Sequence, residues 1–235
     1  MKLYVVVRTY ARQITQLSIA LISIFSSTHD TNFTTTAFVQ NTGAKNTNHD
    51  LNVSIHLVRQ LLDAQNIDHS IVLREFKLFR KNTWGYAHSD KELDIMSSEP
   101  PDYVLFCNGD TYYNSDAFQF LSPLVEQKID VIGMNWIPSS RHVGKDLQYF
   151  KKCEFVHGGV DLNGLLIRYD IIAKSGARFY KQKTPCSEGN AFISNKCRAF
   201  DNREYWVADW GFVIQLEKAG ATMKCVESRP LFVQN

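Results

Sequence analysis

The chain has 235 residues, of which 44% are hydrophobic and 21% are charged, and its formal net charge at pH 7 is +2. This length suits one large α/β domain or two small ones, and the composition is ordinary for a globular protein. The small net charge gives no support for a strongly basic surface, and the basic run at residues 77–81 is short. We therefore expect no nucleic-acid partner.

Strand and helix patterns alternate in the first half of the chain. Apolar, β-branched runs predict strands at residues 2–10, 32–41, 69–76, 102–108 and 129–136. Apolar residues at helical spacing predict two helices, through Ile14, Leu17, Leu21 and Ile24 and through Leu51, Ile55, Val58 and Leu62, and a short third helix is predicted at residues 90–98. This order is typical of an α/β fold, a mostly parallel sheet flanked by helices on both faces.

The apolar segment at residues 14–25 resembles a signal sequence in composition only. It follows a predicted strand, contains several polar residues, and lacks both a basic leading region and a small-residue cleavage site. It is also too short to span a bilayer. We expect a helix packed on the sheet, no transmembrane segment and a cytoplasmic location, with peripheral membrane association left open.

The second half of the chain has a looser pattern. The predicted order is a polar loop at 137–152, the glycine pair Gly158-Gly159, a strand followed by a helix starting near Asp170, a long loop at 181–202, a helix closed by Gly220 and a strand at 222–228. A long loop in a compact domain is often functional. No internal repeat or linker divides the sequence, so we expect a single domain.

The five cysteines are Cys107, Cys153, Cys186, Cys197 and Cys225. Their number is odd, no CxxC pair occurs, and Cys107 and Cys225 lie in apolar runs. These features predict buried free thiols in preference to a disulfide framework. A bridge between Cys186 and Cys197 across a loop is the alternative, which a reducing compartment would disfavour.

Polar residues follow three of the predicted strands. The first strand ends in Arg8-Thr9-Tyr10, the second in Gln40-Asn41-Thr42 and the fourth in Asn108-Gly109-Asp110. The carboxyl ends of parallel strands meet at one edge of a sheet, and ligands bind there. We therefore predict a binding site at this edge. Asn-Gly is also a common turn dipeptide, so Asp110 is either a plain turn residue or a carboxylate presented to the ligand.

The order of these motifs resembles nucleotide-sugar glycosyltransferases of the GT-A fold, closest to family 2. The resemblance rests on VVVRTYAR at 5–12, GYAHSD at 85–90, CNGD at 107–110 and ADWGFVIQLEKAGA at 208–221. It covers nearly the whole chain and implies a GT-A (Rossmann-like) domain. Residues 1–136 would then form the nucleotide-sugar-binding half and residues 137–235 the acceptor and catalytic half. Because GT-A proteins often continue further, a longer polypeptide is also expected.

The resemblance implies transfer of a sugar from a nucleoside-diphosphate sugar, with a UDP-sugar favoured, to a glycan or another hydroxyl acceptor. A divalent metal, Mn²⁺ or Mg²⁺, would neutralise the departing diphosphate, with Asp110 as its ligand. Asn108 stands where the family has an acidic residue, so it would supply a neutral oxygen or a ribose contact. Asp209 would accept the acceptor's proton as general base and give inversion, and its structural alternative is a helix N-cap.

Other site residues are also implied by the resemblance. Arg8, Thr9 and Tyr10 would contact the nucleobase and phosphate, and Gly109 would lie beside the donor. Asn41 stands where the family has an acidic residue that holds uracil, and Asp90 would share that task. Gly158, Gly159, Asp161 and Trp210 would lie near the transferred sugar or acceptor. Asp161 is also the rival carboxylate for a retaining, double-displacement reaction.

Two further functions stay open from the sequence. A nucleotidyltransferase would need a glycine-rich, basic loop after the first strand, and RTYARQIT at 8–15 contains no glycine. A non-catalytic module that binds nucleotide sugars or glycans is favoured by the missing first acidic residue of CNGD. Neither a GxGxxG fingerprint, a Walker-type loop nor a GxSxG motif occurs, which argues against dinucleotide oxidoreductases, P-loop NTPases and serine hydrolases.

Overall fold

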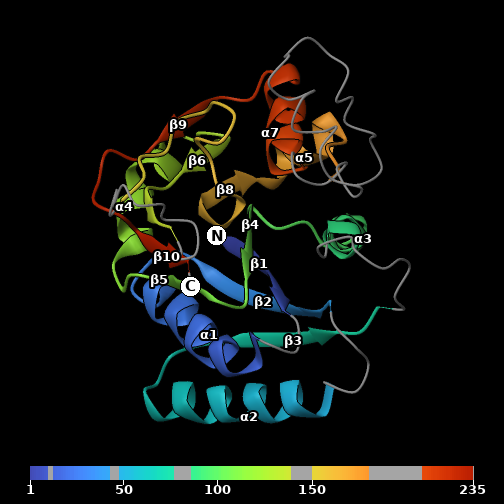
Figure 1. Cartoon of the computed structure of the whole chain (residues 1–235), viewed down its shortest axis with the longest axis vertical. Helices are drawn as coiled ribbons and strands as arrows, with labels where there is room; N and C mark the ends of the chain where they lie inside the picture. Colours follow the sequence, from blue (N-terminus) through green and yellow to red (C-terminus); the bar gives the residue numbers. More distant parts are fainter. Residues whose placement is uncertain (10–12, 43–47, 77–85, 139–149, 180–207, 235) are drawn as a thin grey trace, which may run out of the picture.

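The computed structural model describes residues 1–9, 13–42, 48–76, 86–138, 150–179 and 208–234 (Figure 1). Its strands are β1 (Lys2–Thr9), β2 (Thr34–Asn41), β3 (Ser70–Arg74), β4 (Tyr103–Asn108), β5 (Thr111–Tyr113), β6 (Val131–Gly133), β7 (Trp136–Ile137), β8 (Leu165–Arg168), β9 (Met223–Cys225) and β10 (Phe232–Gln234). Its helices are α1 (Ile14–Thr28), α2 (Asn48–Ala64), α3 (Tyr86–Met96), α4 (Ala117–Glu126), α5 (Tyr169–Ser175) and α7 (Ala208–Lys218), with a short 3-10 helix, η3 (Leu162–Gly164).

Seven strands form the main sheet in the order β3-β2-β1-β4-β8-β6-β9. The neighbours from β3 to β4 are parallel, β8 is antiparallel to both β4 and β6, and β9 is parallel to β6. A smaller sheet of three strands has the order β5-β10-β7. The predicted α/β fold with a mostly parallel sheet is therefore confirmed.

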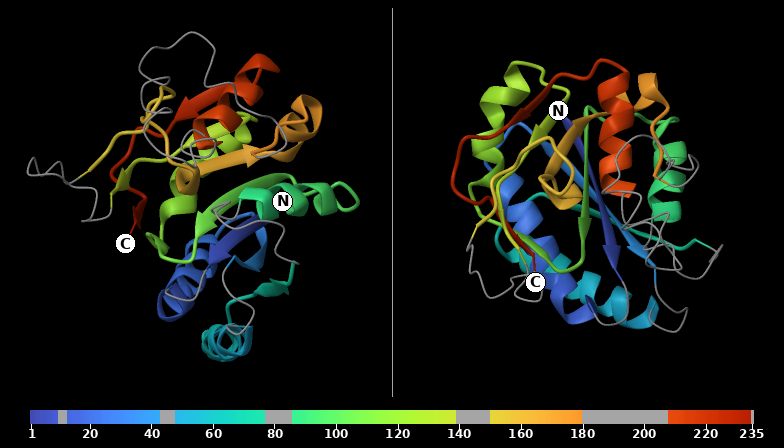
Figure 2. Two further views of the ribbon diagram at one scale, coloured as in Figure 1. Left: turned by 45° about the vertical axis from the view of Figure 1, so that its right-hand side comes forward. Right: turned by 45° about the horizontal axis from the view of Figure 1, so that its top comes forward.

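Helices cover both faces of the main sheet (Figure 2). Alternate residues of β1 enter two separate cores: Leu3, Val5 and Val7 pack with α1, α2 and α4, whereas Tyr4 and Val6 pack with α3, α5 and α7. A strand buried on both faces needs a continuous apolar run, which β1 has. The predicted apolar stripes of α1 and α2 are the residues that these helices bury, so both helices are confirmed.

The structure differs from the sequence prediction around residues 129–136, because one predicted strand is divided between two sheets. β6 lies in the main sheet and β7 in the small one. Asn135 lies between them and donates from Nδ2 to the carbonyl oxygens of Val226 at 3.2 Å and Ser228 at 2.5 Å. These bonds redirect the chain between the two sheets. Neither α4, β5 nor β10 was predicted.

The prediction of free thiols is wrong for two cysteines, since Cys153 and Cys225 form a disulfide. Gly133 of β6 pairs with Cys225 of β9, and a Cβ added at Gly133 would lie 2.2 Å from the Cys153 Sγ. The missing side chain therefore makes room for the bridge. Cys107 is free and buried, as predicted. Cys186 and Cys197 lie outside the described residues.

A buried carboxylate anchors α3 across the ends of β2 and β3. Glu92 is fully buried, and it accepts hydrogen bonds from Arg74 Nε at 3.0 Å and from Gln40 Nε2 at 3.3 Å. Burial raises the pKa of Glu92, and the adjacent Arg74 guanidinium opposes that rise. The network holds α3 against the edge of the sheet at which β1, β2 and β4 end.

Replacing Glu92 by alanine is expected to lower the free energy of unfolding by about 3 kcal/mol, because Arg74 and Gln40 would lose their buried partner. Glu99→Ala is the matched control. Glu99 pairs with Lys2 at 3.1 Å, but both side chains are more than half exposed, so its loss should cost less than about 1 kcal/mol. Urea unfolding measures both variants. Equal effects would show that the Glu92 network does not stabilise the fold.

No helix within the described ranges combines the length and the apolar character needed to cross a bilayer.

Candidate functional site

The carboxyl ends of β1, β2 and β4 lie side by side. Arg8 pairs in register with Gln40 of β2 and with Asn108 of β4, and Thr9 pairs with Asn41. Two backbone bonds continue this alignment beyond the strands, because Gly109 N–H donates to the Arg8 carbonyl and Thr42 N–H donates to the Thr9 carbonyl, both at 2.8 Å. The structure thus brings together the three predicted polar strand ends. Tyr10 lies outside the described residues.

The turn after β4 places Asp110 at this edge. A Cβ added at Gly109 would lie 2.8 Å from the Thr9 Oγ1, so the close approach of β4 to β1 requires a glycine here. Asp110 is half-buried, and its Oδ2 accepts a hydrogen bond from Gln13 Nε2 at 2.6 Å. Gln13 immediately precedes α1. Asp110 is therefore a turn residue whose carboxylate is held toward the start of α1.

Asp161 and Asn163 build the neighbouring part of the site around η3. The Asp161 Oδ1 accepts hydrogen bonds from the Asn163 backbone N–H at 2.9 Å and from its Nδ2 at 2.5 Å, and its Oδ2 accepts from Gln234 Nε2. Asn163 in turn accepts from the Asn108 backbone N–H through Oδ1 at 2.7 Å. Asp161 is therefore the N-cap of η3. Burial raises its pKa, and the bonds to Asn163 oppose that rise.

Asp209 lies in the first turn of α7 and is half-buried. Its Oδ1 accepts a hydrogen bond from the Tyr86 hydroxyl at 2.6 Å, and the Leu162 backbone N–H acts to lower the Asp209 pKa. Burial raises the pKa of Asp209, the Arg8 guanidinium opposes the rise, and the Asp161 carboxylate adds to it. Because α7 begins at Ala208, Asp209 lies inside the helix, so the N-cap interpretation of this residue is wrong.

Arg8 lies at the centre of these groups rather than on the surface. Its side chain is 6% exposed, and the guanidinium carbon is 4.7 Å from the centre of the Tyr86 ring. Four side-chain atoms at this edge are buried with no hydrogen-bond partner in the described part of the chain: Arg8 Nε, Thr9 Oγ1, Gln13 Oε1 and Gln40 Oε1. Buried polar atoms are normally satisfied, so this group points to a ligand or an ordered water.

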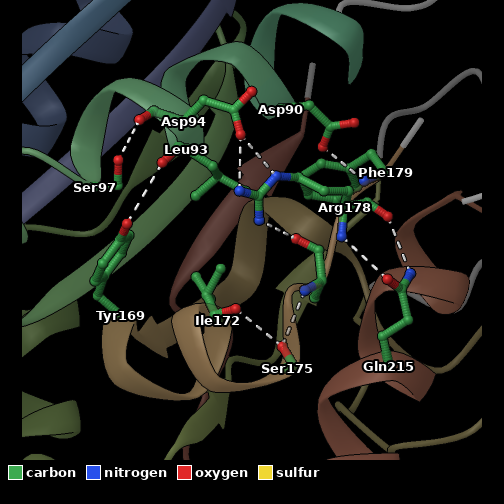
Figure 3. A network of polar contacts seen from close by, with 11 residues as sticks. Asp90, Leu93, Asp94, Ser97, Tyr169, Ile172, Ser175, Arg178, Phe179 and Gln215 are labelled. Carbon is green, nitrogen blue, oxygen red and sulfur yellow. Dashed lines mark hydrogen bonds and ion pairs between the residues drawn. The ribbon is translucent and has the colours of Figure 1, made fainter. Parts of the chain in front are cut away.

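The other predicted site residues have different surroundings. Asn41 ends β2 and is 9% exposed. Asp90 accepts a hydrogen bond from the Phe179 backbone N–H at 2.7 Å, which ties α3 to the segment after α5 (Figure 3). Gly158 has a left-handed φ of +79°, and a Cβ at Gly159 would lie 2.6 Å from the Glu154 carbonyl oxygen, so both belong to a tight turn. Trp210 is half-buried and packs against the core beneath α7.

A second network fixes the elements that carry Tyr86 and Asp209 (Figure 3). Arg178, which follows α5, forms an ion pair with Asp94 of α3 at 2.8 Å. Its backbone N–H donates to Gln215 Oε1 of α7 at 3.1 Å, and Gln215 Nε2 donates back to the Arg178 carbonyl at 3.0 Å. α3 and α7 are thus joined through one residue, which sets the position of Tyr86 relative to Asp209.

Sequence reasoning missed Gln13, Tyr86 and Asn163 as site residues. Tyr86 lies within the GYAHSD motif, but only its position at the start of α3 brings it to Asp209, 123 residues away. Asn163 stands in the run LNGLLI, where a lone amide among apolar residues was a signal of a buried polar role. The sequence around Gln13 contains no comparable indication of a buried polar role.

The described residues contain no group of three or more His, Cys, Asp or Glu side chains that could hold a metal ion. The edge offers the Asp110 carboxylate, with the amide of Asn108 two residues before it. Mg²⁺ is commonly bound by one or two protein carboxylates, and phosphates and water supply its other ligands. The residues present therefore fit a cation that arrives with a phosphate-bearing ligand and do not fit a preformed protein metal centre.

No protein-family model matches the sequence, and no curated protein matches it. Solved structures of TarS from S. aureus, a GT-A-like glycosyltransferase, are similar in fold. TarS residues 1–349 superpose with a TM-score of 0.61 at 12% identity, covering 100% of this chain and 60% of that one. Its complex with UDP-GlcNAc gives a TM-score of 0.58 at 11% identity, covering 99% and 58%.

The chain thus spans about 60% of the length of these TarS structures. At such low identity the likeness establishes the fold alone. The predicted GT-A glycosyltransferase fold is confirmed, and membership of family 2 stays a prediction.

Proposed function

We propose that the chain is a glycosyltransferase that moves a sugar from a nucleoside-diphosphate sugar, with a UDP-sugar favoured, to a hydroxyl group of a glycan or another acceptor. The observation that carries the proposal is the presence of two carboxylates near Arg8 at the carboxyl edge of the sheet: Asp110 follows Gly109, which bonds to the Arg8 backbone, and Asp209 lies in the field of the Arg8 guanidinium. The GT-A fold supports it, and so do the TarS structures in complex with UDP and with UDP-GlcNAc.

In this proposal the donor lies over the ends of β1, β2 and β4, within residues 1–136. Thr9, Asn41, Asn108 and Gly109 contact the nucleotide, and Asp110 binds Mn²⁺ or Mg²⁺ together with the diphosphate. A metal held there would neutralise the charge of the departing diphosphate. Tyr10 and Asp90 are predicted donor contacts as well, although the described partner of Asp90 is the backbone of Phe179.

The acceptor lies on the side of residues 137–235, where Asp209 is the general base. The acceptor hydroxyl gives its proton to the Asp209 carboxylate as its oxygen bonds to the anomeric carbon. The bond from that carbon to the diphosphate breaks, and the diphosphate leaves with the electron pair. Attack from the face opposite the leaving group inverts the anomeric centre. Gly158, Gly159 and Trp210 are the predicted neighbours of the sugar or acceptor.

A retaining reaction through Asp161 has less support. A nucleophilic carboxylate needs an oxygen free to approach the anomeric carbon. Both oxygens of Asp161 accept hydrogen bonds from amides of Asn163 and Gln234, as the N-cap of η3. These contacts favour a structural role for Asp161 over a nucleophilic one.

A non-catalytic module that binds nucleotide sugars is the second candidate. It is favoured by Asn108, which replaces an expected acid. The two candidates separate in one experiment. The protein is incubated with UDP-, GDP- and dTDP-sugars and Mn²⁺, with glycan acceptors present, and free nucleotide and glycosylated product are measured. We expect release of UDP and a product of inverted anomeric configuration. Binding of a donor that stays intact with every acceptor would favour the module.

A further inference from the structure

We infer that Arg8 is a positioning residue for the proposed base, Asp209, and not a donor contact: its buried guanidinium orients that base through Tyr86 and favours its charged form over the protonated one. This inference rests on the proposed function, and it assigns Arg8 a role different from the nucleobase and phosphate contact predicted from the sequence.

The first observation behind this inference is that the Arg8 guanidinium is buried. Arg8 is the penultimate residue of β1, and its side chain points to the face that α3 covers, where it lies over the Tyr86 ring. A charge that is only 6% exposed must be compensated by charged or hydrogen-bonding neighbours. Among the described residues, the carboxylates that interact with Arg8 from this site are Asp161 and Asp209.

The second consideration is the electrostatic repulsion between the carboxylates of Asp161 and Asp209. Two carboxylates in one site disfavour each other's ionised form. The pKa of Asp209 is raised first by burial and further by Asp161, and Arg8 is the largest opposing influence. Arg8 also lowers the pKa of Asp161. A general base must be ionised to accept a proton, and the guanidinium counteracts the two effects that raise the pKa of Asp209.

The groups that face Asp209 come from three elements besides its own helix. These are Arg8 of β1, the Tyr86 hydroxyl of α3, and the Leu162 N–H of η3 with the adjoining Asp161. The guanidinium of Arg8 stacks on the ring of Tyr86, whose hydroxyl donates to the Asp209 Oδ1 at 2.6 Å. Arg8 therefore orients the base through Tyr86 as well as through its charge. The Arg178 network that joins α3 to α7 keeps these distances fixed (Figure 3).

The rival role is a direct contact with the donor, since Arg8 Nε is buried without a described partner. Arg8→Gln separates the two roles because it removes the charge and keeps a polar side chain. Arg168→Gln is the control, because Arg168 ends β8 beside the start of β4, away from the site, and pairs with Asp130 at 3.0 Å. The titration of the Asp209 carboxyl carbon is followed by carbon-13 NMR, with its signal assigned by Asp209→Asn.

We expect Arg8→Gln to raise the pH midpoint of Asp209 by about one unit or more and Arg168→Gln to leave it unchanged. The acidic limb of the pH profile of kcat/KM should move in the same direction, which lowers activity about tenfold on that limb. The dissociation constant for UDP should not change. If the Asp209 midpoint does not move, the inference is overturned, and weaker UDP binding in that case would assign Arg8 to the donor.

A substitute variant and a readout that does not depend on turnover make the experiment conclusive. If Arg8→Gln does not fold, Arg8→Met replaces it, because methionine removes the charge and keeps an apolar chain beside Tyr86, and we expect an upward shift of Asp209 with unchanged UDP affinity. No shift in that variant overturns the inference. The NMR titration does not need turnover. A protein that never releases nucleotide from any donor would therefore contradict the proposed function, while the titration would still decide whether Arg8 controls the charge of Asp209.

Discussion

Replacing Asp209 by asparagine is expected to lower kcat for sugar transfer by about 10³-fold. Asparagine has nearly the same shape and still accepts the hydrogen bond of the Tyr86 hydroxyl, so the first turn of α7 should stay in place. It has no carboxylate to take the proton of the acceptor hydroxyl. The loss should therefore fall on kcat, with the affinity for UDP unchanged.

Steady-state kinetics with saturating donor measure this effect, and calorimetric titration with UDP checks the affinity. Asp170→Asn is the matched control, because Asp170 is an exposed acidic residue at the start of α5 that pairs with Arg168 at 2.9 Å. It should keep full activity. A variant of Asp209 that transfers sugar as fast as the wild type would remove this residue from the proposed mechanism.

Removing the disulfide with the double substitution Cys153→Ser and Cys225→Ser should lower the free energy of unfolding by about 4 kcal/mol, on the chain-entropy account of a loop this long. The bridge joins residues 72 positions apart and ties the chain after β7 to β9, the edge strand of the main sheet. Without it, the unfolded chain gains conformations that the oxidised chain lacks.

Urea unfolding with and without a thiol reductant measures the effect. The wild type should lose stability on reduction, and the double variant should respond far less. Cys107→Ala, which removes the buried free thiol and leaves the bridge, should respond like the wild type. Equal stability of the oxidised and reduced wild type would contradict the prediction. Disulfides persist mainly in oxidising compartments, so this bridge does not favour the predicted cytoplasmic location.

The central sheet was predictable because local patterns dictate it. The β-branched run of β1 and the apolar stripes of α1 and α2 each specify one element without reference to the rest of the chain. The binding edge followed from the same pattern, since parallel strands place their carboxyl ends together. Arg8, Asn41 and Asn108 meet there because strand order and register align them.

The remaining features depend on contacts between distant residues or on conflicting local signals. The bond from Tyr86 to Asp209 and the bridge from Cys153 to Cys225 join elements far apart in the sequence, and no spacing rule relates them. α4 buries Phe118, Leu121 and Leu124 at helical spacing, but Pro123 lies inside it, and proline normally disfavours a helix interior. Asp161 was named from the sequence as the rival carboxylate for a retaining reaction, whereas it is the N-cap of η3 and also accepts a hydrogen bond from the distant Gln234, which no local pattern predicts.

Titration with UDP in the presence and absence of Mn²⁺, on the wild type and on Asp110→Ala, tests the central claim most directly. Asp30→Ala is the control, since Asp30 is an exposed carboxylate beyond the end of α1. The proposed site predicts metal-dependent binding of UDP by the wild type and the control, and loss of the metal dependence with at least about tenfold weaker binding in Asp110→Ala. Absence of UDP binding with every divalent metal tried, or equal binding by Asp110→Ala, would contradict it.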